Sequence, residues 1–168
     1  VVHAALAGLR SLGITQGPTY TQVRFGDQGA FLVETAHRPG GGLDPDVAEL
    51  ASGISMYRQL LGVALDRPAW EAPERIGPQH GGVIGKFLIG QPGQVVSVSG
   101  LDGARALPGI EDAQVYVREG ETVHPLINGS HRIGHVLAVG RDRREAEVRA
   151  EAAATVIRVE TRERTDAS

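Results

Sequence analysis

Cysteine is absent from this chain of 168 residues. Its absence excludes disulfide bonds and thiolate metal sites, and it leaves the redox compartment open. Lysine occurs once, as Lys86, so arginine carries almost all of the basic charge. The sequence also lacks a Gly-x-x-x-x-Gly-Lys-Ser/Thr loop, which excludes a P-loop for the phosphates of a nucleotide.

Strong charge and long apolar runs are absent too. The net charge of −3 and the pI near 6.1 give no electrostatic case for binding nucleic acid or an acidic membrane surface. No apolar run approaches the length of a transmembrane helix, and no charged-then-apolar leader opens the sequence. A Gly-x-Ser-x-Gly elbow is missing, so nucleophilic hydrolysis has no support. We expect a cytoplasmic protein that binds neither nucleic acid nor membranes.

What is present, near the N-terminus, predicts a β-hairpin. Two β-rich runs, residues 17–25 and 30–38, flank a short loop. A three-residue loop over 27–29, with Gly29 in the left-handed conformation, is a common closure. This loop places Val23, Phe25, Phe31 and Val33 on one apolar face, and it sets three cross-strand pairs on the other: Gln22 opposite Glu34, Arg24 opposite Leu32, and Gly26 opposite Ala30.

The polar face of this hairpin suits a cation and an anion together. Gln22 and Glu34 present side-chain oxygens from rigid strands, and Arg38 follows just beyond them. Oxygen ligands suit a hard cation, and an arginine suits the phosphate that the cation accompanies. The simpler alternative is an amphipathic hairpin in which Glu34 and Arg38 form a surface ion pair. A glycine run, Gly40–Gly42, ends the segment.

Residues 13–24 followed by 32–42 resemble the end of the ATP-grasp catalytic domain, with the nearest likeness to carboxylate–amine ligases of the L-amino-acid ligase type. Residues 132–140 and 144–153 are similar to the C-terminal domain of the same enzymes. The resemblance implies a ligase that phosphorylates a carboxylate with ATP and then lets an amine displace the phosphate.

The resemblance also implies roles for individual residues. Glu34 and Gln22 would bind the Mg²⁺ that bridges the ATP phosphates, and Arg38 would contact the transferred phosphoryl group as the catalytic residue. Gly40, Gly41 and Gly42 would let substrate approach the backbone. From its place between Glu34 and Arg38, His37 either contacts substrate or is a loop histidine bonded to the backbone. The family usually has glutamate where this chain has Gln22. Because an amide lacks the charge, Mg²⁺ should bind more weakly here than between two carboxylates.

The expected partners are a further protein lobe and two small-molecule substrates. It starts with Val1 inside an expected helix, so we expect a fragment whose N-terminal ATP-grasp lobe lies in the same or a partner chain. The substrates would be a small-molecule carboxylate and amine, and a homodimer is compatible with this interpretation. A degenerate or accessory subunit is the alternative that Gln22 favours.

Histidines raise a third, weaker hypothesis, a zinc site. His131 and His135 would share one face of a single strand, and His124 precedes them by seven residues. Solvated strand and loop histidines are the simpler interpretation, because no carboxylates stand at a defined spacing to complete the site.

Helices flank the hairpin in the expected order. Apolar periodicity predicts a helix over 2–12. After the glycines, Asp44 can cap a second helix with Pro45 in its first turn, and the apolar pattern continues to about Leu65. Gly53 lies within this second helix or divides it.

The second half predicts an α+β domain. Asp142 and Glu145 form a capping-box pattern at the start of its long helix, which follows a short helix over 101–107. Strands are expected over 82–90, 94–99, 113–118, 132–140 and 157–160. We therefore predict an α+β chain divided into the C-terminal part of an ATP-grasp domain (1–66), a linker (67–82), a small α+β domain (83–161) and a disordered tail (162–168).

Overall fold

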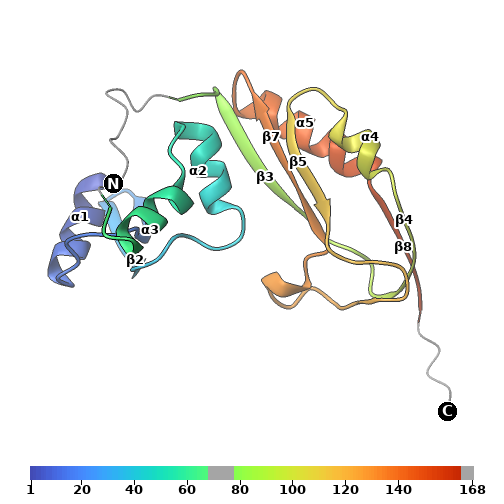
Figure 1. Ribbon diagram of the computed structural model, residues 1–168, viewed down its shortest axis with the longest axis horizontal. Coiled ribbons are helices and arrows are strands. Elements are labelled where there is room, and N and C mark those ends of the chain that lie inside the picture. Colours follow the sequence, from blue (N-terminus) through green and yellow to red (C-terminus); the bar gives the residue numbers. More distant parts are fainter. Residues whose placement is uncertain (68–77, 164–168) are drawn as a thin grey trace, which may run out of the picture. The chain divides into compact units, whose positions relative to one another are not determined.

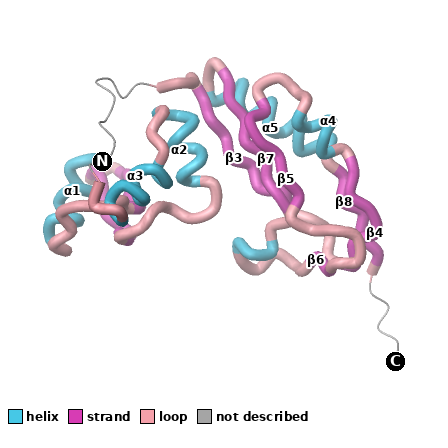
Figure 2. The backbone as a smooth tube through the Cα atoms, in the orientation of Figure 1, coloured by secondary structure: helices cyan, strands magenta, loops and turns pink. Residues whose placement is uncertain are grey.

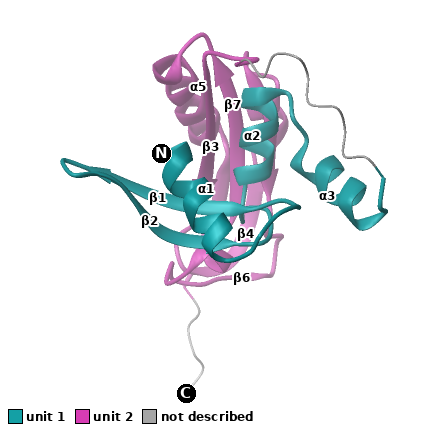
Figure 3. Cartoon of the chain, turned by 90° about the vertical axis from the view of Figure 1, so that its left-hand side faces the viewer, with its two compact units in different colours: residues 1–77 teal, residues 78–168 magenta. Residues whose placement is uncertain are grey.

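The computed structural model describes residues 1–67 and 78–163 (Figure 1). Its contacts divide the chain into two units, residues 1–77 and 78–168 (Figure 3). Both units combine helices with antiparallel strands (Figure 2), so the predicted α+β class is confirmed. In the described part of the chain, no helix is both long enough and apolar enough to cross a membrane.

Unit 1 is a hairpin with three helices. The predicted order of helix, hairpin and helical region is confirmed, and Gly53 divides the helical region because it takes the left-handed conformation, with φ 77°, at the end of the first helix. Ser55 caps the second of these helices through its hydroxyl. The elements are α1 (Val2–Ser11), β1 (Tyr20–Gly26), β2 (Gly29–Ala36), α2 (Asp44–Ser52) and α3 (Met56–Ala64).

The hairpin register differs from the prediction on one side of Gln22. Gln22 pairs with Glu34 as predicted, but Arg24 faces Phe31 and Gly26 faces Gly29. The chain reverses over two residues instead of three, and a bulge beyond Gln22 takes up the extra residue, so the predicted pairs Arg24–Leu32 and Gly26–Ala30 are wrong.

The bulge also overturns the predicted apolar face. Phe31 is 50% exposed and Val33 is 63% exposed. Leu32 is 41% exposed but packs with one side against α1, where a Cβ at the buried Gly8 would overlap the leucine side chain. Because the bulge shifts the pairing by one residue, Phe31 lies opposite Arg24 instead of sharing a face with Val23 and Phe25.

Asp44 does not cap α2. The helix begins at Asp44 with Leu43 in the capping position, and no side chain accepts a hydrogen bond there. Asp44 lies in the first turn, where its negative charge stabilises the helix by interacting with the positive end of the helix dipole.

The described part of unit 2 consists of two antiparallel three-stranded sheets, two α-helices and one 3₁₀ helix. The predicted strands are present, but β5 (Ile110–Val115) begins and ends three residues before the predicted 113–118. The sheets have the orders β3-β7-β5 and β6-β4-β8. The two-residue strand β6 was not predicted, and β8 extends two residues beyond the predicted 157–160. The elements are β3 (Gly82–Leu88), β4 (Gly93–Ser99), α4 (Leu101–Arg105), β5 (Ile110–Val115), β6 (Thr122–Val123), the 3₁₀ helix η1 (Gly129–His131), β7 (Gly134–Gly140), α5 (Arg143–Val156) and β8 (Arg158–Arg162).

Most of the predicted linker, residues 68–77, lies outside the described residues, as does the end of the predicted tail, residues 164–168. The linker's last residue, Gly82, begins β3, and Arg162, assigned to the tail, ends β8.

The hydrophobic core belongs to unit 2. Every residue of β7 is buried, and Val136 is wholly enclosed. One face of the β3-β7-β5 sheet is covered by α5, which contributes Ala150 and Ala153 to the core. Strands β4 and β6 add Val95 and Val123 from the other sheet.

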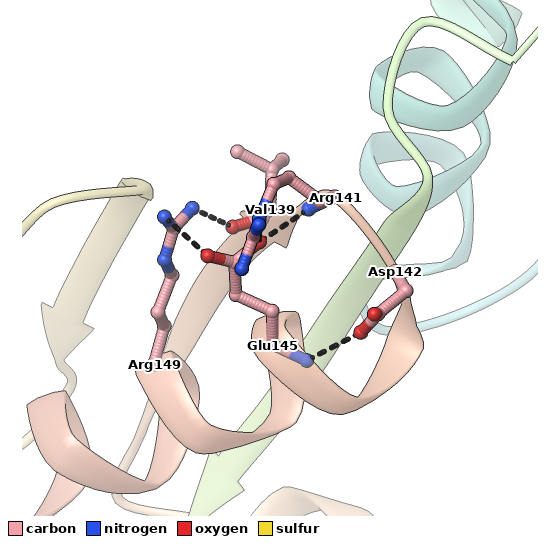
Figure 4. A network of polar contacts seen from close by, with 5 residues as sticks. All are labelled: Val139, Arg141, Asp142, Glu145 and Arg149. Atoms are coloured by element: carbon pink, nitrogen blue, oxygen red, sulfur yellow. Dashed lines mark hydrogen bonds and ion pairs between the residues drawn. The ribbon is translucent and has the colours of Figure 1, made fainter.

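Polar contacts join the end of β7 to the start of α5 (Figure 4). The Asp142 side chain accepts a hydrogen bond from the backbone N–H of Glu145, so the predicted cap is confirmed. The Glu145 carboxylate reaches the backbone N–H of Arg141 instead of that of Asp142, which modifies the predicted capping box. It also pairs with the guanidinium groups of Arg141 and Arg149, each at 3.0 Å.

Candidate functional site

The predicted site residues meet on the face of the β1–β2 hairpin where β2 ends. Gln22 on β1 stands opposite Glu34 on β2, and Arg38 follows two residues after the strand. The closest approach of the Glu34 carboxylate to the Arg38 guanidinium is 3.9 Å. The structure therefore brings Gln22, Glu34 and Arg38 together, as the sequence predicted.

Tyr20 is a member of this cluster that sequence reasoning missed. Its hydroxyl accepts a hydrogen bond of 2.8 Å from the Gln22 amide nitrogen, and the Arg38 guanidinium carbon lies 5.8 Å from the centre of its ring. Tyr20 is two residues before Gln22, so it shares that residue's face of the strand. This period-two relation was the signal that could have identified it.

The hydrogen bond to Tyr20 orients the Gln22 side chain. It uses the amide nitrogen, so the amide oxygen is the atom that Gln22 can offer to a cation. Together with the Glu34 carboxylate, the strand pair supplies two kinds of hard oxygen donor, which is the chemistry that Mg²⁺ prefers.

The site is open to solvent. The side chains of Arg38 and Glu34 are 56% and 50% exposed. An exposed ion pair of this kind contributes about 0–1 kcal/mol to stability, so the pair adds little to folding. The Glu34–Arg38 surface ion pair is thus present. It is compatible both with a purely structural amphipathic hairpin and with a site for a cation and a phosphate. Two recesses of unit 1, of about 340 and 360 Å³, are lined by residues other than Gln22, Glu34 and Arg38.

His37 is directed to the backbone of unit 1. Its Nε2 lies 2.8 Å from the carbonyl oxygen of Gln16, to which it can only donate. The ring also fills the space beside Gly17, where a Cβ would come within 2.6 Å of Nε2. This contact holds the segment that enters β1, so the alternative of a loop histidine bonded to the backbone is confirmed. The contact with substrate stays a prediction.

The three glycines after Arg38 serve different purposes. A Cβ at Gly40 would lie 2.6 Å from the Asp44 carboxylate and 2.9 Å from the Tyr20 ring, so close packing requires glycine there. Gly42 has φ 64°, a conformation that favours glycine. A Cβ at Gly41 would meet no atom within 4 Å, so Gly41 has the open surroundings that an approaching ligand needs.

The three histidines of the zinc hypothesis do not form one site. His131 ends η1 and is not on the strand that carries His135, so the predicted shared face is wrong. His135 is 5% exposed, and its two ring nitrogens contact the Asp112 carboxylate and the Tyr116 hydroxyl. The expectation of a solvated histidine therefore also fails at His135. Nowhere in residues 1–67 and 78–163 do three metal-binding side chains gather.

Comparison with known families and structures agrees with the resemblance. The family L-amino acid ligase C-terminal domain 2 matches residues 86–162. The crystal structure of L-amino acid ligase from Bacillus licheniformis superposes with a TM-score of 0.80 at 20% identity, covering 96% of this chain and 40% of that one. Phosphoribosylglycinamide synthetase from Anaerococcus prevotii superposes with a TM-score of 0.79 at 12% identity, covering 92% and 39%.

A protein of Sinorhizobium fredii, the uncharacterized protein y4rH, is 28% identical over 141 residues, which are 83% of this chain and 28% of that protein. The chain therefore spans less than half the length of each of these proteins. It has the fold of the C-terminal region of ATP-grasp enzymes, and the predicted resemblance is confirmed.

Proposed function

We propose that this chain, which contains an L-amino acid ligase C-terminal domain 2, is the C-terminal part of an ATP-dependent carboxylate–amine ligase. The observation that carries the proposal is the constellation of Gln22, Glu34 and Arg38 on one hairpin face. The fold and the matched family agree with it.

The reaction has two steps in the complete enzyme. A substrate carboxylate oxygen attacks the γ-phosphorus of ATP, the bond to the β–γ bridging oxygen breaks, and ADP leaves. The amine nitrogen then attacks the acyl carbon, the bond to the phosphate oxygen breaks, and an amide forms with loss of a proton from nitrogen. Mg²⁺, when bound, would neutralise charge on the phosphates.

This chain contributes ligands and charge to that chemistry. Glu34 and Gln22 would hold the cation through one carboxylate and one amide oxygen. Arg38 lies next to Glu34 and would stabilise the charge that develops on the phosphoryl group in flight. Gly41 would let the substrate approach the backbone, since the space beside it is open.

A further lobe must supply the remainder of the nucleotide site. Lys86 is the only lysine, and the chain spans 40% of the Bacillus licheniformis ligase. We therefore place the ATP-binding lobe in the same or a partner chain.

The test uses the complete enzyme and ATP-dependent amide formation. Glu34→Ala and Arg38→Ala should each lower turnover by at least about two orders of magnitude, the scale of one lost electrostatic contact in the transition state. Glu49→Ala and Arg58→Ala, which remove exposed charges of α2 and α3 in the same unit, serve as matched controls and should leave turnover unchanged. Activity that survives both test substitutions in a folded enzyme would reduce the hairpin to a structural role.

Gln22 supports a second candidate, an accessory or degenerate subunit. An amide supplies no charge to Mg²⁺, so the site is weaker than one with two carboxylates. Gln22→Glu should lower the Mg²⁺ concentration needed for half-maximal activity. A complete protein with no ATP-dependent activity that gains activity only with Gln22→Glu would favour the degenerate subunit.

A further inference from the structure

Two histidines of unit 2 lie ring beside ring in the segment between β6 and β7. His124 directly follows β6, and His131 is the last residue of η1. Their ring centroids are 5.5 Å apart, and the ring planes are inclined by 36°. His124 is exposed and His131 is half-buried, so solvent reaches the pair.

The hydrogen bonds of His131 determine which ring nitrogen carries the proton. Nδ1 lies 2.7 Å from the carbonyl oxygen of Pro125, and a carbonyl can only accept, so Nδ1 donates. The Ile127 N–H also points at Nδ1, but at 3.5 Å this contact is at the limit for a hydrogen bond, and the shorter one decides the tautomer. The lone pair of His131 is therefore on Nε2.

This arrangement is the usual one for a histidine that binds a metal. Such a residue donates its second ring N–H to a backbone carbonyl or a carboxylate, which fixes the tautomer and the ring orientation. Pro125 supplies that carbonyl to His131.

The separation of the two rings fits a shared ion. An imidazole nitrogen lies about 2.0–2.1 Å from zinc, which puts the ring centre about 3.2 Å from the metal, and two such rings at the tetrahedral angle have centres about 5 Å apart. The observed centroid separation of 5.5 Å is close to this value.

We propose that His124 and His131 form a two-histidine site for a borderline divalent transition-metal ion such as Zn²⁺. Imidazole suits these ions, whereas Mg²⁺ prefers oxygen. Among the residues that the structure describes, no third metal-binding side chain joins the pair, so water completes the coordination and the ion exchanges with solvent. The bound ion would link His124 and His131, which lie at the two ends of the loop over residues 124–131. This inference does not rest on the proposed ligase activity.

The test is a calorimetric titration of the full chain, stripped of metal, with ZnCl₂. We expect saturable one-to-one binding that His124→Gln and His131→Gln each weaken at least about tenfold, because loss of even an outer-shell partner lowers the affinity of a metal site by about 10–100-fold. His3→Gln, which changes an exposed histidine of α1, is the matched control and should leave binding unchanged. In ¹⁵N spectra, the ring signals of His124 and His131 should shift together on addition of Zn²⁺.

Other outcomes overturn the proposal. Absence of saturable Zn²⁺ binding, or binding that survives both substitutions, would leave the two rings as a stacked pair only. Displacement of Zn²⁺ by excess MgCl₂ would show that the ion sits on oxygen ligands. Glu34→Ala should leave Zn²⁺ binding unchanged, so failure of the ligase proposal and failure of this one are separate results.

Discussion

The two units of this chain use their apolar residues in opposite ways. In the described part of unit 1, Leu43 is the only buried large aliphatic side chain, while Phe25, Phe31 and Val33 are exposed. Unit 2 contains the whole of the hydrophobic core cluster, centred on β7 and α5. The polar cluster of the candidate ligase site, by contrast, belongs to unit 1.

The candidate site therefore lies on a unit that has little apolar burial of its own and whose hairpin is supported by α1 packed on β2. A two-stranded hairpin is marginally stable in water unless further strands or a packed helix support it. Burial of apolar area is the main favourable term in folding, and unit 1 buries little of it. Within the described part of unit 1, the hairpin therefore relies on the packing of α1 on β2.

The largest effect is expected from separating the units. Residues 78–163 alone should unfold cooperatively on heating, because they retain the core, whereas residues 1–67 alone should show no cooperative transition. Circular dichroism during a thermal scan measures both, with the full chain as the reference. A cooperative transition in residues 1–67 would show that unit 1 folds without a partner, and the comparison would fail.

One substitution in the core of unit 2 and one on the surface of unit 1 should change the free energy of unfolding by different amounts. Val136→Ala removes methyl groups from a wholly enclosed site and should cost about 2–3 kcal/mol of unfolding free energy. Phe25→Ala removes a larger side chain that is 73% exposed, and it should change the free energy by no more than about 0.5 kcal/mol. Urea denaturation checks both, and equal costs would contradict the assignment of the core to unit 2.

Sequence reasoning succeeded where a local rule decides the structure. Asp142 caps α5 because a short oxygen-bearing side chain before an apolar-periodic segment has few alternatives. The Gln22–Glu34 pair was found although the predicted turn was wrong, because the shorter turn and the bulge shift the register by compensating amounts. The correct Gln22–Glu34 pairing therefore reveals neither the shorter turn nor the bulge.

Tertiary packing decided what the sequence could not show. His135 is buried because Asp112 and Tyr116 of the neighbouring strand region take up its ring nitrogens, and these partners are 19 to 23 residues away. The irregular β5–β7 register between Ile110 and Asp112 is likewise not encoded in alternation. Contacts between residues this far apart in the sequence can be assigned only once the fold is known.

A smaller effect concerns the start of α5. Asp142→Ala removes the acceptor for the Glu145 N–H and should cost about 1 kcal/mol, which lowers the Tm of a unit of this size by about 4–8 °C. Asp102→Ala in the first turn of α4, where no side chain caps the helix, is the control and should have a smaller effect. Calorimetry measures both, and equal shifts would mean that the cap contributes nothing specific.

The smallest effect, and the one that depends on pH, is expected at Glu145. The backbone N–H of Arg141 and then its guanidinium lower the pKa of the Glu145 carboxyl below its usual value. A carboxyl whose pKa is lower in the folded state stabilises the fold above its unfolded pKa of about 4.3, and this stabilisation is lost as the pH falls through the folded value. Glu145→Gln should therefore lower the Tm at pH 7, and the difference from the unsubstituted chain should shrink at acid pH. Glu147→Gln, which changes an exposed carboxyl of the same helix, is the control, and its effect on the Tm at pH 7 should be smaller. A Tm difference for Glu145→Gln that stays constant between pH 7 and pH 3 would mean that the contacts to Arg141 act through packing alone.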